Sequence, residues 1–183
     1  MKALVFTDIR QMTYQDVPDP EANDDEVVVR VKAAGFCGSE LESFVGHSLR
    51  RQPPLIMGHE FSGEIAATGN DVRGLSIGQR VAVNPLISCG ECIYCERGMT
   101  NACPNRKLHS LHLPGAFAEY IAIKGSAVTP ISDTMPYEQI AMAEPLANGL
   151  HVTAFAGEQS PERVVIFGAG VIGLMCLQAA MFR

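Results

Sequence analysis

The sequence predicts a mainly β domain with short helices over roughly the first 150 residues, followed by one βα unit. Three observations lead to this prediction. Short runs of β-branched and aromatic residues recur with turn residues between them, which is typical of a sheet of short strands. A segment with four of the six cysteines has little periodicity of its own. An apolar run, a glycine-rich turn and a second apolar run then close the chain, as a strand followed by a helix does.

The first part of the chain is expected to contain three strands and one short helix. Apolar residues at 2–6 predict the first strand, and the β-branched run that begins at Glu26 predicts the second. Between them, the polar and proline-bearing stretch at 17–26 predicts a turn region. Residues 39–46 predict one or two helical turns with Ser39 as the N-cap. Residues 53–69 predict a loop that leads into the third strand.

The second part is expected to contain two more strands, a helix and the closing βα unit. Residues 79–85 and 115–124 predict strands on either side of the cysteine segment. The alanine-rich apolar stretch at 137–155 predicts a helix, broken near Pro145 or Gly149. A short polar turn at 157–162 then separates this helix from the final strand and helix.

Composition narrows the class of protein. The chain has 183 residues, of which 47% are hydrophobic, and its formal net charge is −6. A duplex-binding protein is more often basic, so nucleic acid is disfavoured as a partner. We expect no membrane span, because no run of about 18 apolar residues is present. The N-terminal segment also lacks the pattern of a secretory signal, so a cytoplasmic location is expected.

The four clustered cysteines predict a structural zinc site. Their spacing is C-x2-C-x2-C-x7-C, formed by Cys89, Cys92, Cys95 and Cys103. Two-residue gaps let a tight turn direct two sulfurs at one ion, and four protein ligands leave no open position on zinc. The beginning of the spacing also resembles a bacterial iron–sulfur run, but that run has three residues before its last cysteine. Free thiols or disulfides are disfavoured because four cysteines fall within fifteen residues of a chain expected in the cytosol.

A second, weaker metal constellation pairs two distant residues. Cys37 and His59 each stand next to glycine, close to segments that predict strands. A thiolate and an imidazole with one further ligand would leave the fourth position of zinc open for water or substrate. The candidates for that ligand are Glu60 and Glu144. A lone cysteine is more often a small buried hydrophobe, so the residues alone leave this site open.

The glycine-rich turn predicts a dinucleotide site. Gly168, Gly170 and Gly173 fit G-x-G-x-x-G between an apolar strand and an apolar helix. In this motif the glycines permit a tight turn, close approach of the pyrophosphate and close helix packing. The amides near Ala169, Val171 and Ile172 would face the phosphates. An ordinary tight βα turn is the alternative interpretation.

Together these motifs resemble the zinc-dependent medium-chain dehydrogenase/reductase family, which is the alcohol dehydrogenase superfamily. Within it, CGS at 37–39, GHE at 58–60 and EPLA at 144–147 resemble the polyol branch of sorbitol, galactitol-1-phosphate and threonine dehydrogenases. The resemblance runs from residue 2 to residue 181. It implies a GroES-like zinc-binding catalytic domain over residues 1–155, with a structural-zinc lobe at 86–106. It also implies the start of a Rossmann dinucleotide-binding domain over residues 156–183.

The resemblance assigns roles to individual residues. It implies a catalytic zinc on Cys37, His59 and Glu144, with Glu60 beside it or exchanging with Glu144. It implies that Ser39 begins a proton relay. The four clustered cysteines would hold the structural zinc. NAD or NADP would bind at the glycine turn, at Gly168, Gly170, Val171, Ile172 and Gly173.

Two positions depart from the family pattern, and four histidines match none of its ligand positions. Glu42 stands where many relatives carry a relay histidine, so Glu42 or water and ribose hydroxyls would pass the proton. Glu40 stands where relatives usually carry Asp and is expected to orient the His59 ring. His47, His109, His112 and His151 are expected at the surface of loops or helices.

The implied activity is NAD(P)-linked oxidation of a secondary alcohol in a polyol or related small molecule. A zinc-stabilised binding or scaffold fragment without chemistry is the alternative. A nucleic-acid-binding zinc ribbon is disfavoured, because the cysteine segment has few basic residues. A complete dinucleotide domain has about six strands, and only one is expected here. The 183-residue chain alone is therefore expected to be inactive, and the full-length protein is expected to be a homodimer or homotetramer.

Overall fold

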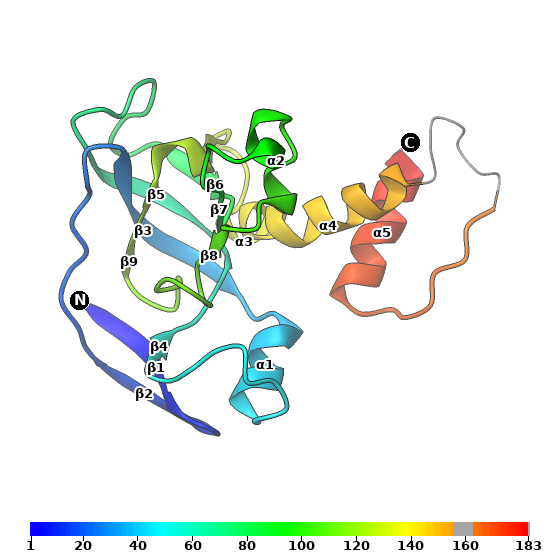
Figure 1. Ribbon diagram of the computed structural model, residues 1–183, viewed down its shortest axis with the longest axis horizontal. Helices are drawn as coiled ribbons and strands as arrows, with labels where there is room; N and C mark the ends of the chain where they lie inside the picture. Colours follow the sequence, from blue (N-terminus) through cyan, green and yellow to red (C-terminus); the bar gives the residue numbers. More distant parts are fainter. Residues whose placement is uncertain (156–162, 183) are drawn as a thin grey trace.

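The computed structural model describes residues 1–155 and 163–182. A β-sheet body carries two helices, α4 and α5, at one end (Figure 1). The strands are β1 (Lys2–Asp8), β2 (Gln11–Asp16), β3 (Glu26–Gly35), β4 (Leu55–Ile56), β5 (Glu60–Thr68), β6 (Arg80–Val83), β7 (Leu86–Ile87), β8 (Lys107–Leu108), β9 (Tyr120–Lys124) and β10 (Val128–Pro130). The helices are α1 (Gly38–Phe44), α2 (Ile93–Glu96), α3 (Tyr137–Ala141), α4 (Ala143–Ala154) and α5 (Val171–Phe182), with short 3-10 turns η1 (Thr100–Ala102) and η2 (Gly125–Ala127).

A five-stranded antiparallel sheet forms the centre of the body, in the order β10-β6-β5-β3-β9. Its core is one cluster of buried apolar residues contributed by all five strands. Val27 and Val29 of β3 are completely buried, because β-branched side chains pack well on a pleated surface. A second sheet, β2-β1-β4, lies beside it, and β7 pairs with β8 next to the cysteine segment. The mainly β prediction is therefore confirmed.

The register of β3 against β5 brings Cys37 and His59 close together. Gly35 at the end of β3 pairs with Glu60 at the start of β5. Cys37 follows β3 by two residues and His59 immediately precedes β5. Because antiparallel strands bring the end of one beside the start of the next, residues 22 positions apart in sequence reach the same place.

Several predicted boundaries were wrong. The helix at residues 38–44 begins after Cys37, which is its N-cap, so Ser39 lies inside the helix. The break in the second helical stretch falls at Met142, between α3 and α4, and not at Pro145 or Gly149. Pro145 lies in the first turn of α4, where the missing amide costs no helical hydrogen bond. The hairpin partner of β1, β2, was not predicted.

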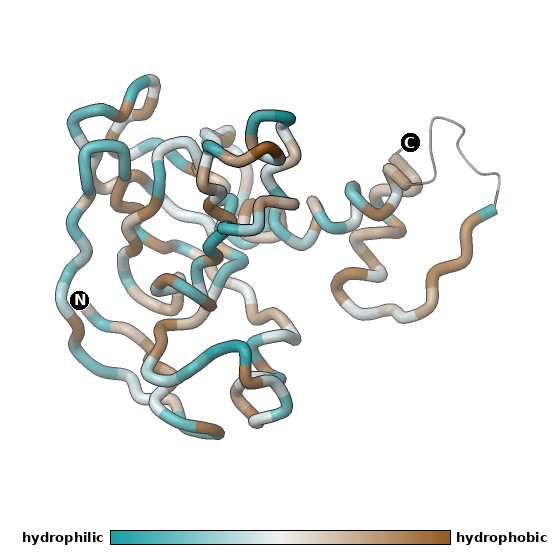
Figure 2. Tube along the Cα trace, viewed as in Figure 1, coloured by the Kyte–Doolittle hydropathy of each residue, from teal (hydrophilic) through white to brown (hydrophobic). Residues whose placement is uncertain are grey.

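The strand expected before the glycine turn is also absent from the described residues. Residues 163–167 have no strand partner there, and a β-strand is defined by its neighbour. Figure 2 shows a largely apolar path through this stretch and along α5, and Phe167 is 96% exposed. The predicted polar turn at 157–162 and the predicted domain boundary at 155/156 involve residues outside the described ones.

Helix α5 packs against α4. A Cβ on Gly149 of α4 would lie 2.6 Å from the backbone carbonyl of Met175 in α5, so the two helix backbones touch at this glycine. Ala179 of α5 is buried as well. None of the helices in the described part of the chain has the length and hydropathy that a membrane crossing requires.

Candidate metal centres and glycine turn

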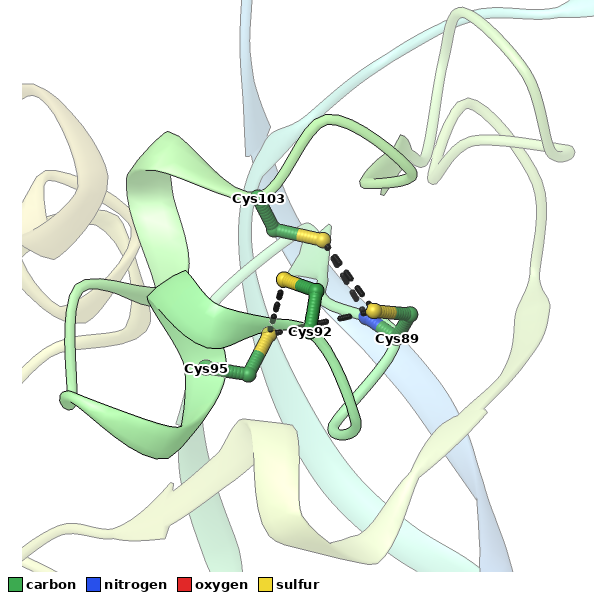
Figure 3. Close-up of side chains that lie close together, drawn as sticks. All are labelled: Cys89, Cys92, Cys95 and Cys103. Atoms are coloured by element: carbon green, nitrogen blue, oxygen red, sulfur yellow. Dashed lines mark hydrogen bonds between the residues drawn. The ribbon is translucent and has the colours of Figure 1, made fainter.

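The four clustered cysteines converge on one point (Figure 3). Their Sγ atoms all lie within 4.8 Å of one another. Neighbouring sulfurs are 3.4 Å apart for Cys92 and Cys95, 3.5 Å for Cys89 and Cys103, and 3.9 Å for Cys89 and Cys95. A tetrahedron with metal–sulfur bonds of about 2.3 Å has edges of about 3.8 Å, whereas a disulfide bond is about 2.05 Å long. The spacing therefore fits a tetrahedral zinc and no disulfide.

Local backbone geometry produces this arrangement. Gly90 and Gly98 have φ values of 81° and 74°, which non-glycine side chains rarely adopt. These turns fold the segment back on the short helix α2, so that Cys92 and Cys95 face Cys89. A hydrogen bond from the backbone of Glu91 is the main reason that the pKa of Cys89 falls to about 7, which favours its thiolate. The hydrogen bond with the backbone of Cys95 lowers the pKa of Cys92, but burial and hydrogen bonds with the neighbouring thiols outweigh it and raise this pKa to about 11.

The second cluster contains Cys37, His59 and Glu60. One donor atom from each lies within 4.8 Å of the others, which makes this the second such group among the described residues. His59 and Glu60 are buried, and Cys37 is half-buried. A Cβ on Gly35 would lie 2.6 Å from Oε2 of Glu60, so a larger residue at that position would push this carboxylate from its present place. A thiolate, an imidazole and a carboxylate suit zinc with one open position.

Glu40 fixes the orientation of this cluster. Its side chain is completely buried, and its Oε1 lies 2.9 Å from Nδ1 of His59. The backbone amide of Gly58 donates to the same oxygen at 2.7 Å, and that of Cys37 donates to Oε2 at 3.1 Å. The expected contact between Glu40 and His59 is therefore present. With Nδ1 of His59 donating to Glu40, Nε2 remains for a metal.

Two residues that sequence reasoning missed complete this network. The hydroxyl of Ser110 donates to Glu40 Oε1 at 2.7 Å. Arg51 is 6% exposed, and its guanidinium donates to the carbonyl oxygens of Ser110 at 2.6 Å and Ser39 at 2.9 Å. Ser110 lies 70 residues from Glu40 in the sequence, so no local spacing pattern signals the contact.

Electrostatics favour the ligating form of the cysteine. The hydrogen bond with His59 is the main reason that the pKa of Cys37 lies below its usual value. Burial lowers the pKa of His59, but its hydrogen bonds with Cys37 and Glu40 outweigh burial and raise it to about 10. A metal that binds both residues must displace the His59 proton, because its ligands are thiolate and neutral imidazole.

Glu144 and Ser39 lie near the cluster but are not part of it. Glu144 is in the first turn of α4 and does not belong to the group whose donor atoms all lie within 4.8 Å. Burial raises the pKa of Glu144, and the charge of Glu60 raises it further, against the effect of His59. The hydroxyl of Ser39 lies 3.4 Å from Cys37 Sγ, while Glu42 is exposed.

The glycine turn faces the second cluster across a cavity of about 540 Å³. Phe36, Cys37 and Glu60 line one side, and the turn from Gly168 to Gly173 with Cys176 lines the other. Gly168 has a φ of 105°. A Cβ on Gly173 would lie 2.0 Å from the carbonyl oxygen of Gly168. Gly168 and Gly173 therefore make a close backbone turn, while binding of a pyrophosphate there stays a prediction.

This chain is similar in sequence to alcohol and polyol dehydrogenases. The family model described as the alcohol dehydrogenase GroES-like domain matches residues 23–133. Sorbitol dehydrogenase of Bacillus subtilis is 38% identical over 184 aligned residues, which cover 98% of this chain and 52% of that protein. The chain spans about half the length of the curated relatives it matches.

Solved structures of dehydrogenases also superimpose on this chain. Galactitol-1-phosphate dehydrogenase from Escherichia coli superimposes with a TM-score of 0.94 at 35% identity, over 100% of this chain and 53% of that one. An alcohol dehydrogenase from Escherichia coli CFT073, solved with NADH, has a TM-score of 0.90 at 33% identity, over 97% of this chain and 52% of that one.

Proposed function

Because the chain belongs to the alcohol dehydrogenase family with a GroES-like domain, we propose that it forms the catalytic half of a zinc-dependent, NAD(P)-linked dehydrogenase. The substrate class we propose is a polyol or a related secondary alcohol. The observation that carries this proposal is the cluster of Cys37, His59 and Glu60 on the same cavity as the glycine turn. A donor set with an open position and a phosphate-binding turn are the two parts that such a reaction needs side by side.

The proposed catalytic zinc is held by Cys37, His59 and one carboxylate. Glu60 has the required proximity in this geometry, and Glu144 remains the ligand that the sequence predicts, with the two carboxylates able to exchange. A zinc ion supplies Lewis acidity toward the substrate oxygen when it is bound. The four clustered cysteines hold a second, structural zinc, so we propose two zinc ions per chain.

The side chains around the cluster handle the proton that alcohol oxidation releases. Oxidation of a secondary alcohol removes a hydride from carbon and a proton from oxygen, so a proton acceptor must be near the substrate oxygen. The Ser39 hydroxyl, beside Cys37 Sγ, is the first group that we propose in this path. Either Glu42, which is exposed on the same helix α1, or water and ribose hydroxyls would then pass the proton to solvent. Glu40 holds the His59 ring throughout.

The remaining assignments follow the family. We propose that the amides and glycines of residues 168–173 bind the pyrophosphate of NAD or NADP, and that residues 1–155 and 156–183 belong to two domains. The full-length protein is proposed to be a homodimer or homotetramer. None of the six cysteines forms a disulfide, which suits the reducing cytoplasm that we propose as its location.

Metal content tests the proposal directly. We expect two zinc ions per chain, one lost on Cys37→Ala and the other lost on Cys103→Ala, as measured by elemental analysis of the folded protein. One zinc that Cys37→Ala does not change would refute the catalytic site and leave a zinc-stabilised scaffold. The matched control is Cys176→Ala on α5, which should keep both ions.

Activity tests the reaction class. The chain extended to the length of its relatives should oxidise members of a polyol panel with NAD or NADP, and Cys37→Ala should abolish turnover. We propose that the 183-residue chain alone has no turnover. Measurable zinc-dependent turnover by that chain would refute this part of the proposal without affecting the reaction class.

A further inference from the structure

A second cavity lies away from both metal centres and from the glycine turn. Its volume is about 390 Å³, which is within the range of small-molecule sites. Its wall is largely apolar and includes Pro18, Ile56, Ile87, Leu113, Ile121 and Ala122. None of its lining residues belongs to the clusters of Cys37 or Cys89, so the proposed dehydrogenase reaction does not use it.

His109 is the informative residue of this cavity. The sequence predicted a surface position, and this prediction was wrong, because the residue is 5% exposed and lines the cavity. Its Nδ1 lies 2.7 Å from the carbonyl oxygen of Pro114. A carbonyl oxygen only accepts, so Nδ1 carries the hydrogen. Burial lowers the pKa of His109, which favours the neutral ring that this arrangement requires.

The other ring nitrogen is then an acceptor that has no hydrogen-bond donor among the described residues. In neutral imidazole with hydrogen on Nδ1, Nε2 has a free lone pair. Among residues 1–155 and 163–182, the only hydrogen bond of the His109 side chain is the one at Nδ1. Nε2 is not among the fully buried unpartnered atoms of the described residues, so it can reach water, and a ligand hydroxyl can take the place of that water as donor.

We propose that this cavity binds a small apolar molecule that carries a hydroxyl group, such as a phenol, with the hydroxyl donating to Nε2 of His109. The apolar wall accounts for the body of the ligand and Nε2 of His109 accounts for its polar group, although Glu26, Tyr120 and Lys124 also line the cavity. A molecule of the same size without a donor gains the apolar contacts but leaves Nε2 unpaired. The site therefore discriminates between a hydroxyl and a methyl group.

The test compares 4-fluorophenol with 4-fluorotoluene, using fluorine NMR titrations of the zinc-loaded chain. His109→Asn keeps an amide donor near the position of Nδ1 and removes the acceptor at Nε2. We expect this variant to lower the ratio of phenol to toluene affinity by about three- to tenfold, the worth of one hydrogen bond. His109→Gln, whose amide reaches the position of Nε2, should restore most of the ratio.

A second variant locates the bound probe. Ala122 is half-buried on β9 and lines the cavity, so Ala122→Phe should fill it and weaken both probes at least tenfold. Thermal unfolding checks that each variant is folded. Binding of neither probe to the unmodified chain, an unchanged affinity ratio in His109→Asn, or binding that Ala122→Phe does not weaken would each overturn the proposal.

Discussion

At the residue scale, the side chain of Glu40 is held by more hydrogen bonds than the proposed zinc ligands that it supports. Glu40 is completely buried and accepts hydrogen bonds from His59, Ser110 and two backbone amides. Burial alone would raise the pKa of Glu40, but the hydrogen bonds from His59 and Ser110 lower it below its usual value. The carboxylate therefore stays ionised inside the protein because its hydrogen-bonding capacity is filled.

Replacing Glu40 by Gln tests this role. The amide offers one acceptor in place of a carboxylate, so the free energy of unfolding should fall by about 1–3 kcal/mol. Zinc affinity at the Cys37 and His59 centre should fall about 10- to 100-fold, because the partner of a metal-binding histidine orients its ring. Urea denaturation and competition with a chelator measure the two effects. Glu42→Gln on the same helix is exposed and should change neither; an unaltered zinc affinity in Glu40→Gln would refute the role.

At the element scale, we expect the cysteine lobe to depend on a bound metal. The segment between β7 and β8 contains only the four-residue helix α2 and one 3-10 turn. Such short elements are not stable in water by themselves, and four thiolates on one ion would provide the missing cross-links.

Chelation should therefore unfold this lobe and leave the main sheet folded. Hydrogen exchange should show loss of amide protection in residues 88–106 after treatment with a strong chelator, with β3 and β5 still protected. Cys103→Ser should reproduce this result without chelator, and Cys176→Ser should not. Uniform loss of protection across the sheet would contradict a local role for the metal.

A polar cluster joins α3 to the sheet. The hydroxyl of Tyr137 donates to Glu64 of β5, Lys32 of β3 lies 3.1 Å from the same carboxylate, and the guanidinium of Arg80 stacks 3.9 Å above the Tyr137 ring. The hydrogen bond from Tyr137 is the main reason that the pKa of Glu64 is lowered. Stability from a lowered carboxyl pKa is present above the unfolded value and is lost as pH falls through the folded value.

Glu64→Gln should therefore lower the free energy of unfolding at neutral pH but not at low pH. The expected loss is at most about 1 kcal/mol at pH 7, since the pair is partly exposed. The difference from the unmodified chain should begin to shrink near the pKa of an unfolded glutamate, about 4.3, and vanish only at a pH below the lowered pKa of folded Glu64. Thermal unfolding across this pH range measures it, with the exposed Glu21→Gln as control. A difference that grows toward low pH would have the wrong sign.

At the scale of the whole molecule, one glycine determines how the two C-terminal helices meet. The backbones of α4 and α5 touch at Gly149, and α5 begins within the glycine turn. The same contact therefore links the β-sheet body to the turn that lines the cavity beside Cys37 and Glu60.

Gly149→Ala should separate these helices. Alanine favours an isolated helix by about 1 kcal/mol over glycine, but its methyl group would collide with the backbone of Met175. We expect amide protection to fall in α5 and not in α4, as measured by hydrogen exchange. Asn148→Ala gives a similar gain in helix propensity on an exposed position and should leave α5 unchanged. Equal protection of α5 in both variants would refute the contact.

The sequence by itself determined the parts whose chemistry is local. The spacing of Cys89, Cys92, Cys95 and Cys103 predicts one ion because all four thiols lie in one short segment, and the glycine turn is equally self-contained. The pairing of Cys37 with His59 was predicted only weakly from the residues, and the family resemblance raised it to a specific expectation.

Only the tertiary structure decided which distant groups meet. The register of β3 against β5 brings Glu60 beside Cys37 and His59, while Glu144 as the third ligand stays a prediction. Ser110 hydrogen-bonds Glu40, and Arg51 hydrogen-bonds the helix that contains Glu40, each from a separate loop. His109 is buried, whereas the sequence predicted it at the surface. Such contacts depend on chain folding over tens of residues, which periodicity and spacing do not encode, because those signals report only on neighbours within a few turns.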